Sequence, residues 1–210
     1  MASVSGNVFM LSGMPEAGLG AQPQNGGRTV IGVDEAGRGP LAGPVVAAAV
    51  VLCRPCVAGL DDSKKLSREQ RAVLEPRIRR RCAYGVGVVD VDAIDRMNIF
   101  WATMLAMTLA VERVVAALAC EPDEVLVNGN LTPAGRNSGW RWPARAIVGG
   151  DAREKCISAA SIVAKEHRDR LMRAHHAAHP HYGWETNPCA GRSGCRSGSY
   201  PPRRRGRWPP

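Results

Sequence analysis

Residues 30–44 constrain the fold of this 210-residue chain more than any other stretch. The apolar run over residues 30–33 predicts a β-strand. Two adjacent acids, Asp34 and Glu35, follow it, and then comes a loop with three glycines, two prolines and one arginine. Neighbouring side chains on a strand point to opposite faces. Asp34 and Glu35 can therefore serve one site only if the strand bends or ends at them, which the loop permits.

The residue types in this stretch suit the chemistry of a phosphodiester. Two carboxylates at a strand end can hold a hard cation such as Mg2+ or Mn2+. Glycines let the backbone approach a polyanion closely, and Arg38 offers a fork of hydrogen-bond donors. On these residues alone, a strand and a turn with two solvated acids is an equal alternative. A phosphate-binding transferase fits poorly, because the chain has no GxxxxGK[ST] pattern.

Hydrophobic patterning predicts an α/β domain with a mixed five-stranded sheet flanked by helices. We expect strands over residues 29–34, 44–53, 82–89, 124–127 and 144–148. The first three are close in sequence and suit an antiparallel meander. The last two follow helices or long crossovers, so they should pair parallel with the first strand.

Three helices are expected between and after these strands. One covers residues 67–81, because Ser67 and Gln70 have capping-box spacing. A second, apolar helix covers residues 99–120, with Asn98 as its cap after an acidic turn at residues 90–95. A third starts after Asp151 and ends near residue 175.

Composition divides the chain into three parts. Residues 1–27 are rich in Gly, Ser, Gln, Asn and Pro and read as a disordered leader, residues 28–187 as the folded domain, and residues 188–210 as an irregular Arg/Pro/Gly-rich tail. The tail carries six arginines and no acid, so the net charge of +9 falls to 9 − 6 = +3 without it. The net charge of the chain is therefore weak evidence that it binds nucleic acid. The tail is either a basic arm or, as we favour, the product of a frameshift.

The cysteines and apolar runs indicate a cytoplasmic protein with no membrane partner. Seven scattered cysteines suit reduced thiols, and the CxxC pair at residues 53–56 lacks the second pair of a zinc site. Residues 1–27 contain no Lys or Arg, so the basic start of a signal peptide is missing. The apolar runs at residues 45–53 and 99–111 are too short to span a bilayer.

Two further polar positions fall where an α/β sheet places its sites, at strand ends and helix starts. Asn128 follows the fourth expected strand, and Asp151 follows the fifth. Each has a simpler interpretation. The pair Asn128-Gly129 is common in type I′ hairpin turns, and Asp151 could be a helix N-cap.

Five motifs in order along residues 30–187 resemble those of type 2 ribonuclease H, the ribonuclease HII family. They are VDEAGRGPLAGP at residues 33–44, DSKKLS at 62–67, IDRMNI at 94–99, GGD at 149–151 with SAASIVAK at 158–165, and HPHYGW at 179–184. The resemblance implies that residues 28–187 form a catalytic domain with a ribonuclease H-like fold. It also implies an endonuclease that cuts RNA in RNA–DNA hybrids and incises 5′ to ribonucleotides embedded in DNA, and we expect this endonuclease to be a monomer.

The resemblance also assigns roles to residues. The family uses four carboxylates and Mg2+ or Mn2+, and Asp34, Glu35 and Asp151 match three of the four. Gly37, Arg38, Gly39 and Tyr182 would recognise the RNA-to-DNA junction, whereas Lys64, Lys65 and Lys165 would contact phosphates. Without the resemblance, Tyr182 would be a surface tyrosine and the lysines would be solvated.

Two features depart from the family pattern. Asn128 stands where the third metal-binding aspartate belongs, so it is the expected fourth ligand but carries no charge. The tail lacks the segment with Gly, Thr and His and the terminal helix that the family has. Reduced activity is therefore expected, and the alternative is an impaired relative that binds hybrids without cutting them.

Overall fold

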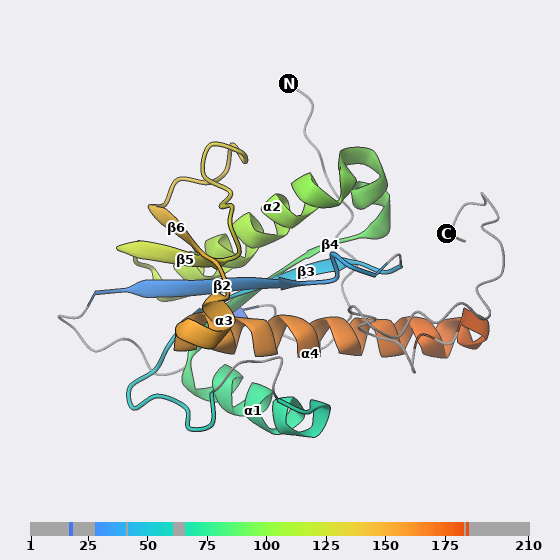
Figure 1. Ribbon diagram of the computed structural model, residues 1–210, viewed down its shortest axis with the longest axis horizontal. Helices are drawn as coiled ribbons and strands as arrows, with labels where there is room; N and C mark the ends of the chain where they lie inside the picture. The colour runs from blue at the N-terminus through green and yellow to red at the C-terminus, as the bar shows by residue number, and fades with distance from the viewer. Residues whose placement is uncertain (1–16, 19–27, 41, 61–65, 183, 185–210) are drawn as a thin grey trace.

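The computed structural model describes residues 17–18, 28–40, 42–60, 66–182 and 184 of the chain. A mixed sheet forms its centre, with α2 on one face and α4 on the other, and α1 packs on the outer side of α4 (Figure 1). The strands are β1 (Ala17–Gly18), β2 (Val30–Ala36), β3 (Val45–Val51), β4 (Ala83–Val89), β5 (Glu124–Asn128) and β6 (Ala144–Ile147). The helices are α1 (Arg68–Arg81), α2 (Val91–Leu118), α3 (Gly150–Arg153), α4 (Lys155–Ala178) and the 3-10 turn η1 (Pro180–Tyr182).

The strand order β1-β4-β3-β2-β5-β6 confirms the predicted mixed sheet. β2, β3 and β4 form the antiparallel meander, and β5 and β6 continue the sheet parallel to β2. The sheet has six strands rather than five, because β1 pairs antiparallel with β4. β1 belongs to the segment expected to be a disordered leader. The rest of that segment and the tail lie outside the described residues.

The core has two layers, one on each face of the sheet. On β3, Val45, Ala47 and Ala49 belong to the cluster under α2, whereas Val46, Ala48 and Val50 belong to the cluster under α4. This alternation leaves the whole of β3 buried, as expected for a central strand covered on both sides. β2 alternates in the same way, and Ile31 and Val33 face α2.

α2 is longer than expected and bends near its start. Asn98 has non-helical backbone angles (φ 66°, ψ 164°), and its Oδ1 accepts hydrogen bonds from the backbone N–H groups of Phe100 and Trp101 at 2.9 and 3.3 Å. The predicted cap is confirmed. The predicted acidic turn is wrong, because the side chain of Asp90 accepts from Ala93 N at 2.8 Å and caps a further helical segment.

By length and composition alone, α2 could cross a membrane, because the two helical segments together exceed the apolar run seen in the sequence. However, 56% of its most apolar window is buried inside the structure. There it packs on β3 and β4. Its apolarity is therefore explained by its place in the core.

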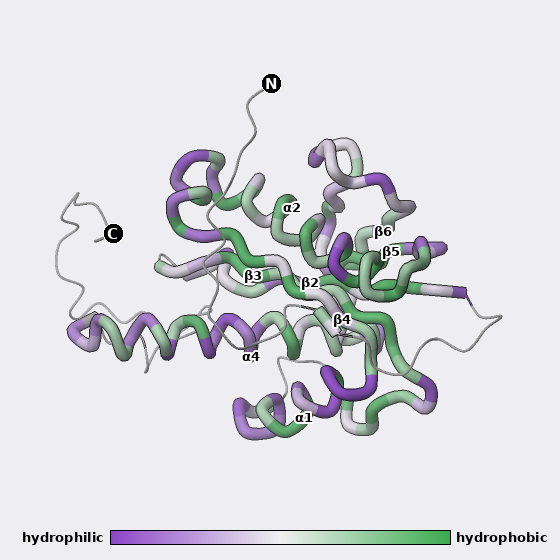
Figure 2. Tube along the Cα trace, turned by 180° about the vertical axis from the view of Figure 1, so that it is seen from behind, coloured by the Kyte–Doolittle hydropathy of each residue, from purple (hydrophilic) through white to green (hydrophobic). Residues whose placement is uncertain are grey.

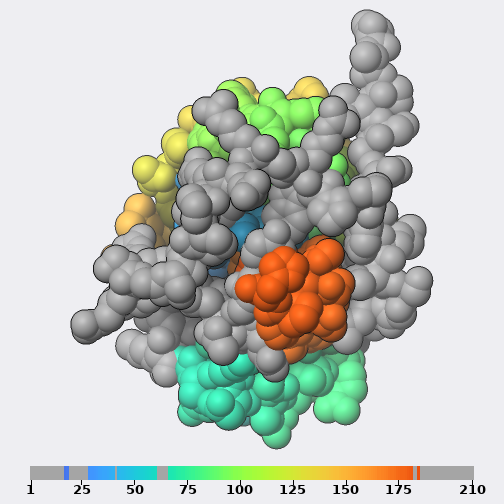
Figure 3. Space-filling view, turned by 90° about the vertical axis from the view of Figure 1, so that its right-hand side faces the viewer, coloured from blue at the N-terminus to red at the C-terminus, as the bar shows by residue number. Residues whose placement is uncertain are grey.

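α1 and α4 form the other outer layer. The capping box at Ser67 is confirmed, since Gln70 N donates to Ser67 Oγ at 3.2 Å and Ser67 N donates to Gln70 Oε1 at 2.7 Å. The third expected helix is divided into the single turn of α3 and the long α4. At the surface, the C-terminal end of α4 (orange) lies directly above α1 (teal to green) in Figure 3.

Candidate active site

The parallel strands bring three of the four expected metal ligands together at their carboxyl ends. Val33 pairs with Val127 across β2 and β5, so Asp34 and Asn128 follow as the next residues on neighbouring strands. Asn128 pairs with Ile147 of β6, and Asp151 comes just after β6, in α3. The carboxyl ends of parallel strands are where sheets of this kind place their sites.

Asn128 lies between the two buried aspartates, Asp34 and Asp151, at the carboxyl ends of the strands. Its Nδ2 donates to Asp34 Oδ1 at 2.9 Å, and its Oδ1 accepts from the backbone N–H of Gly150 at 3.0 Å. Gly150 is the neighbour of Asp151. The amide therefore joins β2 to the start of α3. An ionised aspartate at this position could accept from Gly150 but could not donate to Asp34.

The simpler interpretations of both positions are wrong. β5 and β6 are parallel, so Asn128 and Gly129 do not form a hairpin turn. The N-cap positions of α3 and α4 are Gly149 and Glu154, so Asp151 is not a cap. Asp151 is instead buried, with an exposed fraction of 2%.

Asp34 is buried on the face of β2 that α4 covers, with an exposed fraction of 4%. Burial raises the pKa of Asp34, although hydrogen bonds with Ser161 and Asn128 and the charge of Lys165 act in the opposite direction. Ser161 and Lys165 lie four residues apart on α4, one turn of the helix, so both reach the same carboxylate. The sequence contained this spacing within its SAASIVAK motif, but the role of Ser161 was missed.

Glu35 follows Asp34 within β2, which continues to Ala36. The strand therefore ends two residues later than the expected range of 29–34, one residue beyond the two acids. Burial, and after it the charge of Asp34, raise the pKa of Glu35 to about 7, although Arg38 acts in the opposite direction. Arg38 Nη1 lies 3.4 Å from Glu35 Oε1.

The oxygen donors of these side chains suit a hard divalent cation, although the carboxylates do not already form a cluster that could bind one. Within the residues that the structure describes, no three His, Cys, Asp or Glu side chains are close enough to hold a metal ion. Asn128 occupies the central position among the expected ligands. Carboxylate and amide oxygens are nevertheless the ligands that Mg2+ prefers. A cation would also offset the burial and repulsion that raise the pKa values of Asp34 and Glu35.

The expected substrate residues are placed as follows. Gly37 is half-buried, while Arg38 and Gly39 are exposed on the loop after β2. Lys165 lies near Asp34, as its effect on the Asp34 pKa shows. Tyr182 ends η1, just beyond α4. Lys64 and Lys65 lie outside the described residues.

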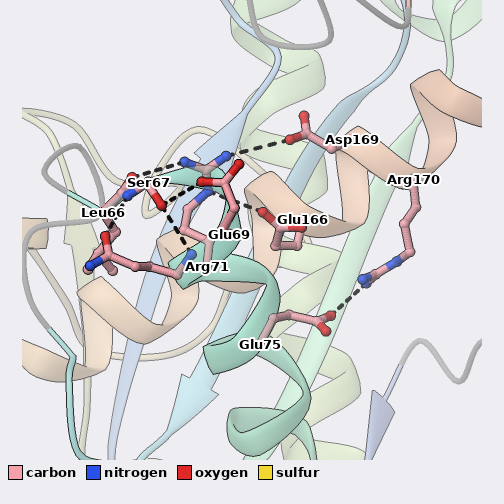
Figure 4. A network of polar contacts seen from close by, with 9 residues as sticks. Leu66, Ser67, Glu69, Arg71, Glu75, Glu166, Asp169 and Arg170 are labelled. Carbon is pink, nitrogen blue, oxygen red and sulfur yellow. Dashed lines mark hydrogen bonds and ion pairs between the residues drawn. The ribbon is translucent and has the colours of Figure 1, made fainter.

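An ion-pair network joins α1 to α4 immediately after Lys165, the last residue of the SAASIVAK motif (Figure 4). Arg71 Nε lies 3.2 Å from Glu166 Oε1, and Arg71 Nη2 lies 3.7 Å from Asp169 Oδ2. Arg71 Nη1 also donates to the carbonyl of Leu66 at 3.2 Å. The end of the DSKKLS motif is thereby fixed to α4, the same helix that carries Lys165.

The mixed sheet with helices on both faces is a ribonuclease H-like α/β fold, the class to which solved ribonucleases H2 and H3 belong. The ribonuclease H2 of Pyrococcus horikoshii superposes with a TM-score of 0.59 at 28% identity, covering 71% of this chain and 76% of that one. A ribonuclease HII of Archaeoglobus fulgidus, solved in complex with PCNA, gives 0.58 at 26%, covering 71% and 77%. A ribonuclease HIII in complex with Mn2+ gives 0.60 at 26%, covering 72% and 56%.

Sequence relatives narrow the class to one family. The family model described as Ribonuclease HII matches residues 31–193. The ribonuclease HII of Novosphingobium aromaticivorans is 72% identical over 159 residues, covering 75% of this chain and 81% of that protein. That of Erythrobacter litoralis is 58% identical over 178 residues, covering 85% and 84%. The chain belongs to the ribonuclease HII family, and it is an endoribonuclease that hydrolyses RNA in RNA–DNA hybrids.

Proposed function

We propose that this ribonuclease H uses two divalent cations, Mg2+ or Mn2+, and that it also incises DNA 5′ to embedded ribonucleotides. The observation that carries the proposal is the chain of contacts from Asp34 through Asn128 to Gly150, beside Asp151. It supports a shared site at the strand ends. The ribonuclease HIII neighbour in complex with Mn2+ supports the choice of metal.

In this proposal, Asp34, Glu35 and Asp151 hold the cations through charged oxygens, and Asn128 is a weak, uncharged fourth ligand. The cations would activate the attacking water and stabilise charge on the leaving oxygen. Lys165 and Ser161 hold Asp34 in place from α4. Arg38 restrains Glu35 through their 3.4 Å contact.

The substrate would lie over the exposed loop after β2. Backbone of Gly37 and Gly39 and the side chain of Arg38 would contact the strand at the RNA-to-DNA junction, with Tyr182 beside the sugar. The 2′-hydroxyl is the group that distinguishes RNA from DNA at such a step. Lys64, Lys65 and Lys165 would contact phosphates along the hybrid.

The test is cleavage of two labelled duplexes, an RNA–DNA hybrid and a DNA duplex with one ribonucleotide. Each is incubated with Mg2+, with Mn2+, and with a chelator. Cleavage 5′ to the ribonucleotide that requires the metal supports the proposal. Cutting of the hybrid but not of the second duplex would contradict the incision step, and binding of both without cutting would favour the impaired relative.

We further propose that the enzyme acts as a monomer in the cytoplasm. Sedimentation of the purified protein at micromolar concentration, with and without hybrid, tests the first point. A dimeric mass for the free protein would contradict it. Fractionation of the producing cells tests the second, and membrane-bound protein would contradict it.

A further inference from the structure

Arg168 of α4 is the largest fully buried side chain in the described part of the chain, with an exposed fraction of 0%. Burying a guanidinium is unfavourable unless its N–H groups are hydrogen-bonded. Here Arg168 Nε donates to the carbonyl of Pro44 at 3.1 Å, and Nη2 donates to the carbonyl of Ala42 at 2.8 Å. Both acceptors belong to the loop that joins β2 to β3. A charge on the inner helix thus binds the backbone of the loop expected to read the substrate.

Two glycines of that loop pack closely against the guanidinium. Gly37 has φ 107°, and a Cβ there would lie 2.6 Å from Arg168 Nε and 2.6 Å from the carbonyl of Pro44. Gly43 has φ 83°, and its Cβ would lie 3.4 Å from Arg168 Nη2 and 2.4 Å from Met172 Sδ. Both the backbone angles and the available space therefore require glycine. The loop closes around Arg168 at each end.

The middle of the loop has the opposite environment. A Cβ at Gly39 would meet nothing within 4 Å. Arg38 and Gly39 are exposed, and Arg38 contacts Glu35 at 3.4 Å. The loop thus has an inner side held by Arg168 and an outer side open to a ligand.

We propose that Arg168 is a positioning residue for substrate recognition. It fixes the carbonyls of Ala42 and Pro44, so that Arg38 and the backbone of Gly39 are presented to the RNA-bearing strand in one arrangement. Arg168 does not touch substrate itself. The effect on substrate rests on the proposed function, whereas the hold on the loop does not.

The test uses Arg168→Met, which removes every donor, and Arg168→Lys, which keeps the charge and one donor group. Arg170→Met is the matched control. Arg170 lies two residues away on α4, but its Nη2 contacts Glu75 Oε1 of α1 at 2.6 Å rather than the loop. Thermal unfolding of each variant measures the loss of stability, so that it can be distinguished from an effect on substrate recognition.

Two readouts separate positioning from stability. We expect Arg168→Met to raise KM for the hybrid, and the Kd measured without metal, at least about tenfold, with kcat changed less than about threefold. Trypsin should cleave after Arg38 at least about tenfold faster, because the released loop opens more readily. Arg168→Lys should recover part of both effects, and Arg170→Met should show neither.

An unchanged KM and unchanged cleavage after Arg38 in Arg168→Met, with only a lower Tm, would overturn the proposal. So would equal effects in Arg170→Met. If Arg168→Met does not fold, Arg168→Lys decides the matter, because wild-type values for both readouts in that variant would equally overturn it. Failure of the wild-type enzyme to cut hybrids would refute the function instead, and the tryptic assay would still test the hold of Arg168 on the loop.

Discussion

The two faces of the sheet are built from different kinds of residues. The buried part of α2 is apolar except for Thr103 and Thr108, and each hydroxyl donates to a carbonyl of its own helix, at 2.7 and 2.9 Å. α4 alternates between hydrophilic and hydrophobic residues along its length (Figure 2). Its buried residues include Glu166, Arg168 and Asp169.

This difference suggests that one face of the sheet mainly stabilises the fold and the other mainly serves function. An apolar face needs only shape and volume to be stable. Buried polar groups need partners, so a face that contains them is restricted to one arrangement. α4 uses such groups to reach Asp34, the loop after β2 and, through Arg71, the end of the DSKKLS motif. We therefore infer that α2 stabilises the fold, whereas α4 organises the site.

Replacement of Asp34 on the α4 face should give the largest effect on activity. Asp34→Asn removes one of the proposed charged ligands and should lower kcat/KM by about a thousandfold, a loss typical of removing one key electrostatic group. Stability should stay equal or rise, because burial disfavours the ionised form of Asp34. Cleavage rates and thermal unfolding measure the two effects. The exposed Asp92→Asn on α2 is the control, and a similar rate loss there would contradict the division between the faces.

Truncation on the α2 face should have the opposite result. Met107 is 2% exposed within the apolar cluster, so Met107→Ala should lower the free energy of unfolding by about 2–5 kcal/mol. The kcat of the remaining folded enzyme should be unchanged, because α2 packs mainly on β3 and β4 rather than on the strands that carry the expected ligands. Val73→Ala on the exposed side of α1 is the control, with a change within about 0.5 kcal/mol. A large kcat loss in folded Met107→Ala would show that both faces shape the site.

Replacing Asn128 by aspartate tests whether the charge that is missing from the site limits activity. Asn128→Asp restores a fourth carboxylate and should raise kcat/KM at least about tenfold, by analogy with losses around metal sites. It should also remove the donor to Asp34, so metal-free protein should lose stability through repulsion. Asn130→Asp adds the same charge at an exposed position two residues away and should change neither. Equal rates for wild type and Asn128→Asp would refute the prediction.

Much of the α2 face could be predicted from the sequence, because the relevant signals are local. Apolar runs marked the central strands, and Asn98 marked a helix start. The acidic segment before Asn98 was mistaken for a turn, since a cap at Asn98 hid a second cap at Asp90 only eight residues earlier. β1 was missed because a strand of two residues has no detectable period.

The α4 face could be predicted only in part. The motifs predicted which residues to expect at the site, but not how they contact one another. The bond between Asn128 and Asp34 joins residues 94 apart in sequence, and Arg168 meets Ala42 across 126 residues. No local pattern shows that an arginine in a helix is buried rather than solvated, because arginine is usually exposed.

The polar α4 face should also make stability depend on pH. His167 is buried against Glu75 and Arg79 of α1, with Arg170 and Arg113 nearby, and burial lowers its pKa to about 4 from an ordinary 6.5. The unfolded chain therefore binds a proton between these values that the folded protein excludes. His167 favours the folded state fully above pH 6.5, and this contribution is lost as the pH falls towards 4, by at most about 1.4 kcal/mol per pH unit. His167→Gln should flatten the dependence of unfolding free energy on pH over this window, whereas the exposed His181→Gln should not. Equal slopes in wild type and His167→Gln would show that the polar face carries no such pH dependence through this residue.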